Sequence, residues 1–159
     1  MSKQPPDQGA DAVVAVQRGF ELFNAGDLEA LFTETFDPKI AYRGDPDISA
    51  LAGFPTNAEG ADGVRAVWVA FFAMFDEIQL TDIELVPEDD ETVLGRCHMV
   101  AQGGSSGIPI DAPFYFAWVL RKGRWVFMAA KLDRDQTLAS LREWQSGSGV
   151  RDADQSSQE

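Results

Sequence analysis

The sequence predicts an α+β fold in a single domain, and three features of the chain lead to this prediction. Its 159 residues favour one domain, and 45% of them are hydrophobic, which is typical of a chain with a folded core. Apolar residues recur at helical spacing in the first half of the chain and at alternate positions in the second half. Helices that come first and antiparallel strands that follow indicate α+β rather than alternating βαβ units.

The N-terminal segment predicts two short helices joined by a tight turn. Asp11 is a suitable N-cap for the first helix, whose apolar face repeats at spacings of three and four through Val13, Val16, Phe20 and Phe23. Gly26 suits the left-handed position that ends a helix. Asp27 then caps a second helix, whose inward side chains are Leu28, Leu31 and Phe32.

The middle of the chain predicts a strand, a loop and the clearest helix. Residues 38–42 are expected to form a short strand. Residues 43–61 hold three glycines and two prolines and show no regular period, so we expect an irregular loop at the active face. A third helix is expected over residues 64–75, with one face formed by Val64, Val67, Trp68, Phe71, Phe72 and Phe75.

The second half of the chain changes to a period of two, which predicts a meander of antiparallel strands over residues 78–86, 92–102, 114–121 and 124–132. Lys122-Gly123 is a hairpin turn, and residues 103–107 form a flexible link. A final helix is expected over residues 136–144. The folded domain is therefore predicted to span residues 11–145, between disordered segments at residues 1–10 and 146–159.

Charge and motif content argue against several classes of function. The net charge of −13 disfavours nucleic acid and membrane surfaces as partners. With the single cysteine Cys97 and a single histidine, the chain cannot supply the usual zinc ligands, so we expect no metal. The sequence holds no phosphate-binding glycine loop and no nucleophile elbow, so we expect no cofactor. A polar start and the lack of a long apolar run lead us to expect a cytoplasmic location.

Four phrases of the sequence carry a resemblance to a known family: FNAGDLEAL at 23–31, AYRGDPD at 41–47, GADGVRAVWVAFFAMF at 60–75 and LRKGRWVFMAAKLDRDQTLASL at 120–141. In this order they resemble the SnoaL-like branch of the NTF2-like superfamily, over roughly residues 12–142. The resemblance implies a strongly curved sheet wrapped around helices, with a conical cavity that opens at one end. It also implies frequent dimerisation through the outer face of the sheet, so we expect a homodimer.

Tyr42 and Asp45 lie at the end of the first predicted strand and at the start of its loop. In the fold that the chain resembles, this region lines the mouth of the pocket. A carboxylate beside apolar walls can act as a base near neutral pH, and Tyr42 can donate a hydrogen bond. The alternative for Asp45 is a plain turn role, because Asp-Pro-Asp is favourable turn chemistry.

His98 is the only histidine, and its side chain can exchange protons near pH 7. If it faces the cavity, it is a general acid or base; if it faces outward, it belongs to the sheet surface or to a dimer interface. Alternation places His98 on one face with Arg96 and Val100, and Cys97 and Met99 on the other. Because the second set is more apolar, the pattern favours the outward orientation.

Asp133 and Lys131 occupy alternate positions at the end of the last predicted strand, so they share a face. In SnoaL-like cyclases, which the chain resembles, a carboxylate near this point serves as the base, so the resemblance assigns that role to Asp133. Lys131 would keep the carboxylate ionised and could also bind a ligand. The alternative for Asp133 is a capping box with Gln136. Asp111, near two prolines, is expected to be a solvated turn residue.

Five aromatic side chains are expected to wall a pocket for a flat or polycyclic ligand, although their spacing is also that of ordinary core: Trp68, Phe72, Phe114, Phe116 and Trp118. Two functional hypotheses remain. The first is an enzyme of the polyketide cyclase, isomerase or lyase type, which would perform cofactor-free acid–base chemistry on a small, mostly apolar carbonyl compound.

In this hypothesis the base is Asp133 or Asp45, His98 is the acid or an electrostatic partner, and Tyr42 is the hydrogen-bond donor. The second hypothesis is a non-catalytic ligand-binding or dimerisation module. An open pocket on which at least two polar groups converge would favour the enzyme, whereas a cavity filled by its aromatic side chains would favour the module.

Overall fold

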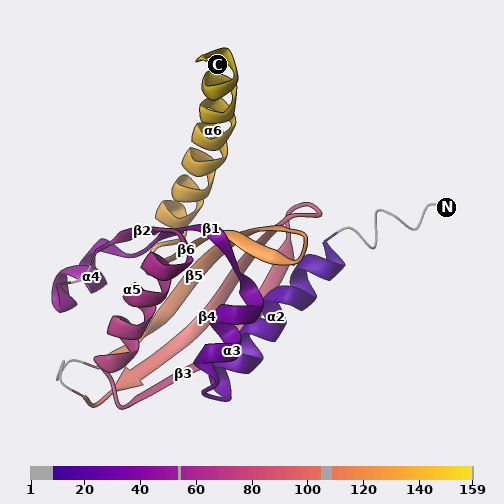
Figure 1. Cartoon of the computed structure of the whole chain (residues 1–159). Coiled ribbons are helices and arrows are strands. Elements are labelled where there is room, and N and C mark those ends of the chain that lie inside the picture. Colours follow the sequence, from indigo (N-terminus) through magenta and orange to yellow (C-terminus); the bar gives the residue numbers. More distant parts are fainter. Residues whose placement is uncertain (1–8, 54, 105–108, 159) are drawn as a thin grey trace.

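A curved six-stranded sheet forms the centre of the protein over residues 9–53, 55–104 and 109–158, which are those that the computed structural model describes (Figure 1). Its strands are β1 (Phe36–Arg43), β2 (Asn57–Glu59), β3 (Glu77–Pro87), β4 (Thr92–Gln102), β5 (Ile110–Arg121) and β6 (Arg124–Lys131). They follow the order β2-β1-β6-β5-β4-β3. β1 and β6 are parallel, and the other neighbours are antiparallel. The predicted α+β class is confirmed.

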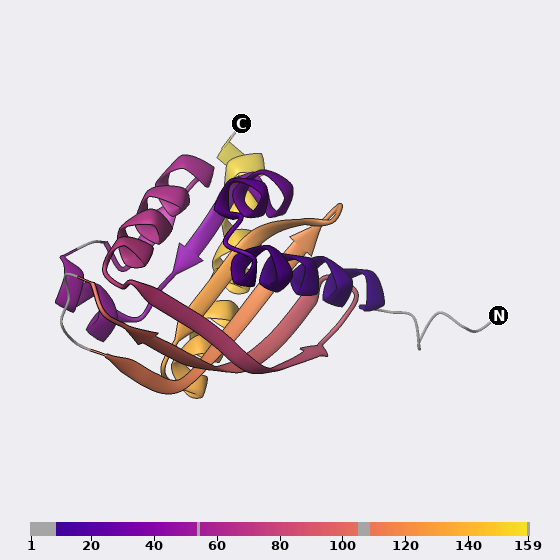
Figure 2. The ribbon, with the colours of Figure 1, turned by 90° about the horizontal axis from the view of Figure 1, so that it is seen from below.

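Three helices pack inside the curve of the sheet within this described part of the chain (Figure 2): α2 (Ala10–Asn24), α3 (Leu28–Thr35) and α5 (Ala61–Ala73). α3 begins where the sequence predicts, because the Asp27 carboxylate accepts a hydrogen bond from the Ala30 N–H at 3.2 Å. α2 buries Val16 and Phe20 in the main core, and α5 adds Val64. These helices therefore close one side of the sheet.

The segment from residue 43 to residue 61 contains a helix and a short strand, so the prediction of an irregular loop was wrong. α4 (Pro46–Ala52) begins at Asp45, whose carboxylate caps it, and Pro46 occupies the first helical turn. Proline at that position has a preset φ angle and lacks an N–H that would be unpaired there. β2 pairs with β1 through Ala58 opposite Tyr42. The helix start signal of Asp45-Pro46 therefore produces a helix even though the segment contains three glycines.

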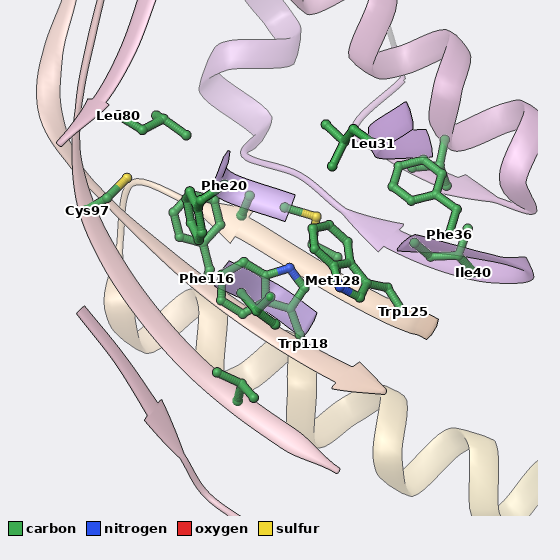
Figure 3. Packing of buried hydrophobic residues seen from close by; sticks show 14 of the residues in the cluster. Phe20, Leu31, Phe36, Ile40, Leu80, Cys97, Phe116, Trp118, Trp125 and Met128 are labelled. Atoms are coloured by element: carbon green, nitrogen blue, oxygen red, sulfur yellow. The ribbon is translucent and has the colours of Figure 1, made fainter. Parts of the chain in front are cut away.

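The two faces of the sheet carry different apolar clusters. The inner face contributes Phe114, Phe116, Trp118, Trp125 and Met128 to the main core, part of which is drawn in Figure 3. The outer face forms a second cluster around Phe127 and Leu141. β3 is irregular between Thr81 and Glu84, where Asp82 has a φ of 54°. A bulge of this kind bends a strand and increases its twist, so it helps the sheet to curve.

The last helix, α6 (Arg134–Gln158), packs on the outer face of the sheet. The Trp144 ring stacks on Phe127 at 4.9 Å between centroids, and Arg142 donates to Glu88 in the β3–β4 turn at 2.8 Å. The sequence predicts that this helix ends at Trp144, before a disordered tail, but it continues to Gln158. No proline follows Trp144, and a glycine costs a helix only about 1 kcal/mol relative to alanine.

α6 covers part of the face through which the predicted homodimer would form, and dimerisation stays a prediction. The predicted disorder of residues 1–10 falls mostly outside the described residues, and α2 already begins at Ala10. Residues 105–107 of the predicted link also lie outside them. In the part of the chain that the structure describes, no helix is both long and apolar enough to cross a membrane.

Candidate functional site

An aromatic cavity lies between the inner face of the sheet and helices α2, α4 and α5. It leaves about 80 Å³ for the centres of water-sized molecules. Since a single water needs roughly 10–15 Å³ by this measure, the space is large enough for a small organic molecule. The aromatic side chains that line it are Phe20, Phe23, Tyr42, Trp68, Phe71, Phe72, Phe114, Phe116, Trp118 and Trp125.

Polar side chains gather at one end of the cavity, where β1 passes into α4. Tyr42, Asp45, Ser49 and Thr56 all belong to the lining. Gly44 allows this close approach, because a Cβ on it would lie 2.9 Å from the Tyr42 ring and 2.9 Å from the Thr56 carbonyl oxygen. We call these four side chains the polar cluster.

Asp45 is buried, and its carboxylate accepts hydrogen bonds from three backbone N–H groups. Its Oδ1 accepts from Asp47 at 2.9 Å and from Ile48 at 3.2 Å, which caps α4. Its Oδ2 accepts from the N–H of Leu132, just beyond the end of β6, at 2.9 Å. An ionised carboxylate offers about four acceptor positions, so roughly one remains for a ligand. The carboxylate is therefore held in one orientation at the cavity wall.

Tyr42 points from β1 into the cavity and packs edge-on against Trp68, with 6.4 Å between the ring centroids. Burial, and then the negative charge of Asp45, raise the pKa of Tyr42 above its ordinary value of 10. The phenol therefore keeps its proton near neutral pH and is available as a hydrogen-bond donor.

Ser49 and Thr56 complete the polar cluster. Their hydroxyl oxygens lie 2.6 Å apart, and Ser49 also donates to the Asp45 carbonyl oxygen at 3.1 Å. The backbone N–H of Gly44 donates to the Thr56 carbonyl oxygen at 2.8 Å, which ties the two sides of this segment together. Ser49 is therefore linked both to Thr56 and to the backbone of Asp45.

The structure brings together some of the predicted site residues and separates others. Tyr42, Asp45 and all five predicted wall residues line the cavity, whereas His98, Asp133 and Lys131 do not. The outward orientation of His98, which the alternation favours, is correct: its ring Nε2 contacts the carboxylate of Asp111 on the outer side of the sheet. The cavity-facing role that was considered for His98 therefore needs correction.

Asp133 caps α6 instead of facing the cavity. Its Oδ2 accepts from the Gln136 N–H at 2.9 Å, which is the capping alternative. Lys131 follows Ala130 on β6 and points to the opposite side of the sheet, because Ala130 lines the cavity. Burial lowers the pKa of Lys131, and the negative charge of Asp45 opposes that effect. The structure therefore places Asp133 at the start of α6 and outside the cavity lining, whereas Asp45, after β1, belongs to that lining.

Sequence reasoning missed Ser49, Thr56, Gly19 and Trp125 as lining residues. Ser49 and Thr56 were hidden in the segment that was predicted as a loop, although Asp45-Pro46 is a helix start signal. Gly19 lies inside α2, where a Cβ would be only 2.6 Å from the Trp125 ring. This contact depends on how α2 packs on β6, which a periodic pattern does not reveal.

Both Trp118 and Trp125 present buried indole N–H groups that have no hydrogen-bond partner among the described residues. Their side chains are 1% and 2% exposed. Nearly all buried donors in proteins are paired, so two unpaired ones in a single cavity are unusual. In the described part of the chain, no group of three or more His, Cys, Asp or Glu side chains could hold a metal ion.

The curved sheet and the inner helices that pack around the aromatic cavity form an NTF2-like fold. A family profile for the SnoaL-like domain matches residues 16–128, and the chain belongs to this family. The resemblance that the sequence phrases carry is therefore confirmed. Among curated proteins, no sequence matches the chain.

Several solved structures share this fold. An NTF2-like protein of unknown function from Burkholderia pseudomallei is 20% identical, with a TM-score of 0.66, over 83% of this chain and 95% of that one. TerC, co-crystallized with polyporic acid, is 16% identical, with a TM-score of 0.65, over 84% and 96% of the two chains. A candidate polyketide cyclase from Xanthomonas campestris pv. campestris is 17% identical, with a TM-score of 0.63, over 86% and 95%. At these identities the similarity establishes the fold alone.

Proposed function

We propose that this protein is an enzyme that performs cofactor-free general acid–base chemistry on a small, mostly apolar carbonyl compound. The observation that carries the proposal is the polar cluster at one end of an otherwise aromatic cavity. Apolar walls with a few convergent polar groups are typical of sites that bind and orient small organic molecules. Relatives of this fold that are candidate polyketide cyclases support the same class of reaction.

Tyr42 and Asp45 have complementary roles in the proposed step. The Tyr42 O–H donates to the carbonyl oxygen of the substrate, and the Asp45 carboxylate removes a proton from the adjacent carbon. The C–H electron pair then forms the carbon–carbon double bond of an enolate, whose oxygen keeps the hydrogen bond to Tyr42. In an isomerisation, the protonated Asp45 returns the proton to a different carbon of a conjugated dienolate. In an aldol cyclisation, the enolate carbon attacks a second carbonyl carbon, and the alkoxide that forms takes the proton from Asp45.

The surroundings favour this chemistry in two ways. Three backbone N–H groups hold the Asp45 carboxylate in place, so little reorganisation is needed when the substrate arrives. The aromatic walls exclude water and lower the local dielectric, which strengthens the hydrogen bond from Tyr42 to a developing oxyanion. Ser49 and Thr56 would orient further oxygen atoms of the substrate.

The first test measures proton abstraction directly and requires no knowledge of the product. In D₂O, the protein should accelerate exchange of the hydrogens next to the carbonyl of 1-tetralone, followed by ¹H NMR. Removing a donor of this kind typically lowers a rate about 10²–10³-fold, so Tyr42→Phe should show a loss of that order. Asp45→Asn, which keeps an acceptor for the α4 cap, should reduce the exchange to the rate in buffer.

His98→Ala and Asp133→Ala are matched controls, because they remove titratable side chains that do not line the cavity. They should leave the exchange rate within about twofold of the unsubstituted protein. A rate equal to that of buffer for a folded protein that binds the ketone would favour the alternative, a non-catalytic binding module. Crystals soaked with apolar ketones, polyphenols and polyporic acid would then locate the bound ligand.

A further inference from the structure

Two tryptophans of the cavity wall carry buried N–H groups for which the described residues supply no acceptor. Trp118 and Trp125 are almost fully buried, and neither indole N–H has a partner among the described residues. An indole is a donor and has no acceptor atom, so a second indole cannot satisfy it. The acid–base step proposed above uses neither group.

The two indoles belong to one region of the cavity. They lie on neighbouring strands, β5 and β6, with their ring centroids 5.8 Å apart and their planes inclined by 56°. Figure 3 shows the nitrogen-bearing edge of Trp118 turned toward Trp125, beside Met128. The nearby lining is apolar and includes Met128, Phe116 and Phe20. No backbone carbonyl among the described residues accepts a hydrogen bond from either indole.

Trp125 and the Asp45 carboxylate lie at different places along the cavity, whereas Tyr42 and Trp118 both lie opposite Met128 in one row across the sheet. Trp125 lies near the start of β6. The Asp45 carboxylate accepts a hydrogen bond from the N–H of Leu132, which follows the last residue of β6. A strand rises about 3.3 Å per residue, so these positions are well separated along the cavity. A flat molecule that reaches both must carry oxygen atoms at two separate places.

We propose that Trp118 and Trp125 form a binding site for an acceptor oxygen of the ligand, of the carbonyl or quinone type. This inference rests on the proposed function and names the substrate class: an apolar ring compound that carries a second, unprotonated oxygen distant from the reacting carbonyl. A hydroxyl group would serve less well here, because the site offers donors and its own proton would lack an acceptor. A hydrocarbon of the same shape would leave both N–H groups unpaired.

The test compares 1-tetralone with tetralin, two bicyclic compounds of similar shape that differ in one carbonyl. Their dissociation constants are measured by NMR titration in the Tyr42→Phe background, which removes the phenol donor of the polar cluster. One net hydrogen bond is worth about a factor of ten, so the ketone should bind about tenfold more tightly than the hydrocarbon. Trp118→Phe and Trp125→Phe should each reduce this ratio at least threefold.

Trp68→Phe is the matched control for lost ring area, because Trp68 lines the same cavity and its N–H is not among the buried unpaired groups. It should weaken both ligands alike and preserve their ratio. If a substitution of Trp118 or Trp125 prevents folding, the benzothienylalanine analogue keeps the shape and lacks the N–H. A readout independent of substitution is the ¹H–¹⁵N spectrum, in which 1-tetralone but not tetralin should move these two indole signals downfield.

The outcomes separate this inference from the proposed function. An affinity ratio that survives both substitutions, or indole signals that respond equally to both compounds, would overturn the indole site and leave the acid–base step intact. If neither compound binds the folded protein at millimolar concentration, the indole site and the proposed function both fail.

Discussion

Removing the Asp45 carboxylate should destabilise this fold far more than removing an ordinary helix cap. Asp45→Ala leaves three backbone N–H groups without their acceptor: two at the start of α4 and one just after β6. Loss of a cap costs about 0.5–2 kcal/mol, and a hydrogen bond to a charged group contributes about 1.5–3 kcal/mol. Because both kinds of interaction are lost at a buried site, we expect the free energy of unfolding to fall by about 3 kcal/mol.

Asp45→Asn separates the two contributions. Asparagine caps helices as well as aspartate does, so α4 keeps its acceptor. Its amide NH₂ would face the Leu132 N–H. Because both groups are donors, the hydrogen bond between residue 45 and Leu132 would be lost. We therefore expect a cost of about 1–2 kcal/mol for the asparagine variant, roughly half that of alanine.

Urea denaturation followed by tryptophan fluorescence measures both values. With a slope of about 1–3 kcal/mol per molar urea, a loss of 3 kcal/mol moves the midpoint down by at least about 1 M. Asp133→Ala is the control, because Asp133 makes a single, exposed side-chain cap bond to the Gln136 N–H. It should cost no more than about 1 kcal/mol. Equal losses for Asp45→Ala and Asp133→Ala would refute the bridging role of Asp45.

Three further predictions concern Tyr42, Cys97 and Leu141. Because the folded-state pKa of Tyr42 is raised, its contribution to stability is complete below pH 10 and is lost as the pH rises through that folded-state value. Tyr42→Phe should therefore reduce the alkaline fall of the urea midpoint, and an identical fall in both proteins would contradict the raised pKa. Burial raises the pKa of the Cys97 thiol to about 12, so the native protein should resist a disulfide reagent at pH 8 and react fully in urea. Leu141→Ala empties a fully buried position between α6 and the sheet, which should cost about 2–5 kcal/mol in urea unfolding while the affinity for 1-tetralone stays unchanged.

The sequence predicts most of the fold because each element has a local cause. The face of α2, the cap at Asp27 and the alternation in β3 to β6 are all properties of short segments. The same alternation favours the outward orientation of His98 over its catalytic role. Asp45-Pro46 is also a local signal, for the start of a helix, but it was interpreted as a turn, and α4 was therefore not predicted.

The site itself depends on pairings that no local pattern contains. Trp118 lies opposite Met128, but the register of β5 and β6 shifts between Val119 and Leu120. This shift changes which β6 residues share a face with Trp118, and Trp125 consequently falls on the inner side. Asp45 reaches Leu132, 87 positions further along the chain, only because β1 and β6 run parallel side by side. Such contacts follow from the assembled sheet.

If the proposed indole site is correct, the two unpaired N–H groups connect the stability of this protein to ligand binding. A buried donor without a partner costs about 1–3 kcal/mol, which is a large fraction of the net stability of a small domain. The aromatic cluster that surrounds Trp118 and Trp125 is extensive enough to tolerate this cost. A ligand that supplies the missing acceptor removes the cost as well as filling the cavity, and it binds the folded state alone. Its stabilising effect should therefore exceed that of a hydrocarbon present at the same concentration, because tighter binding raises the apparent stability through mass action.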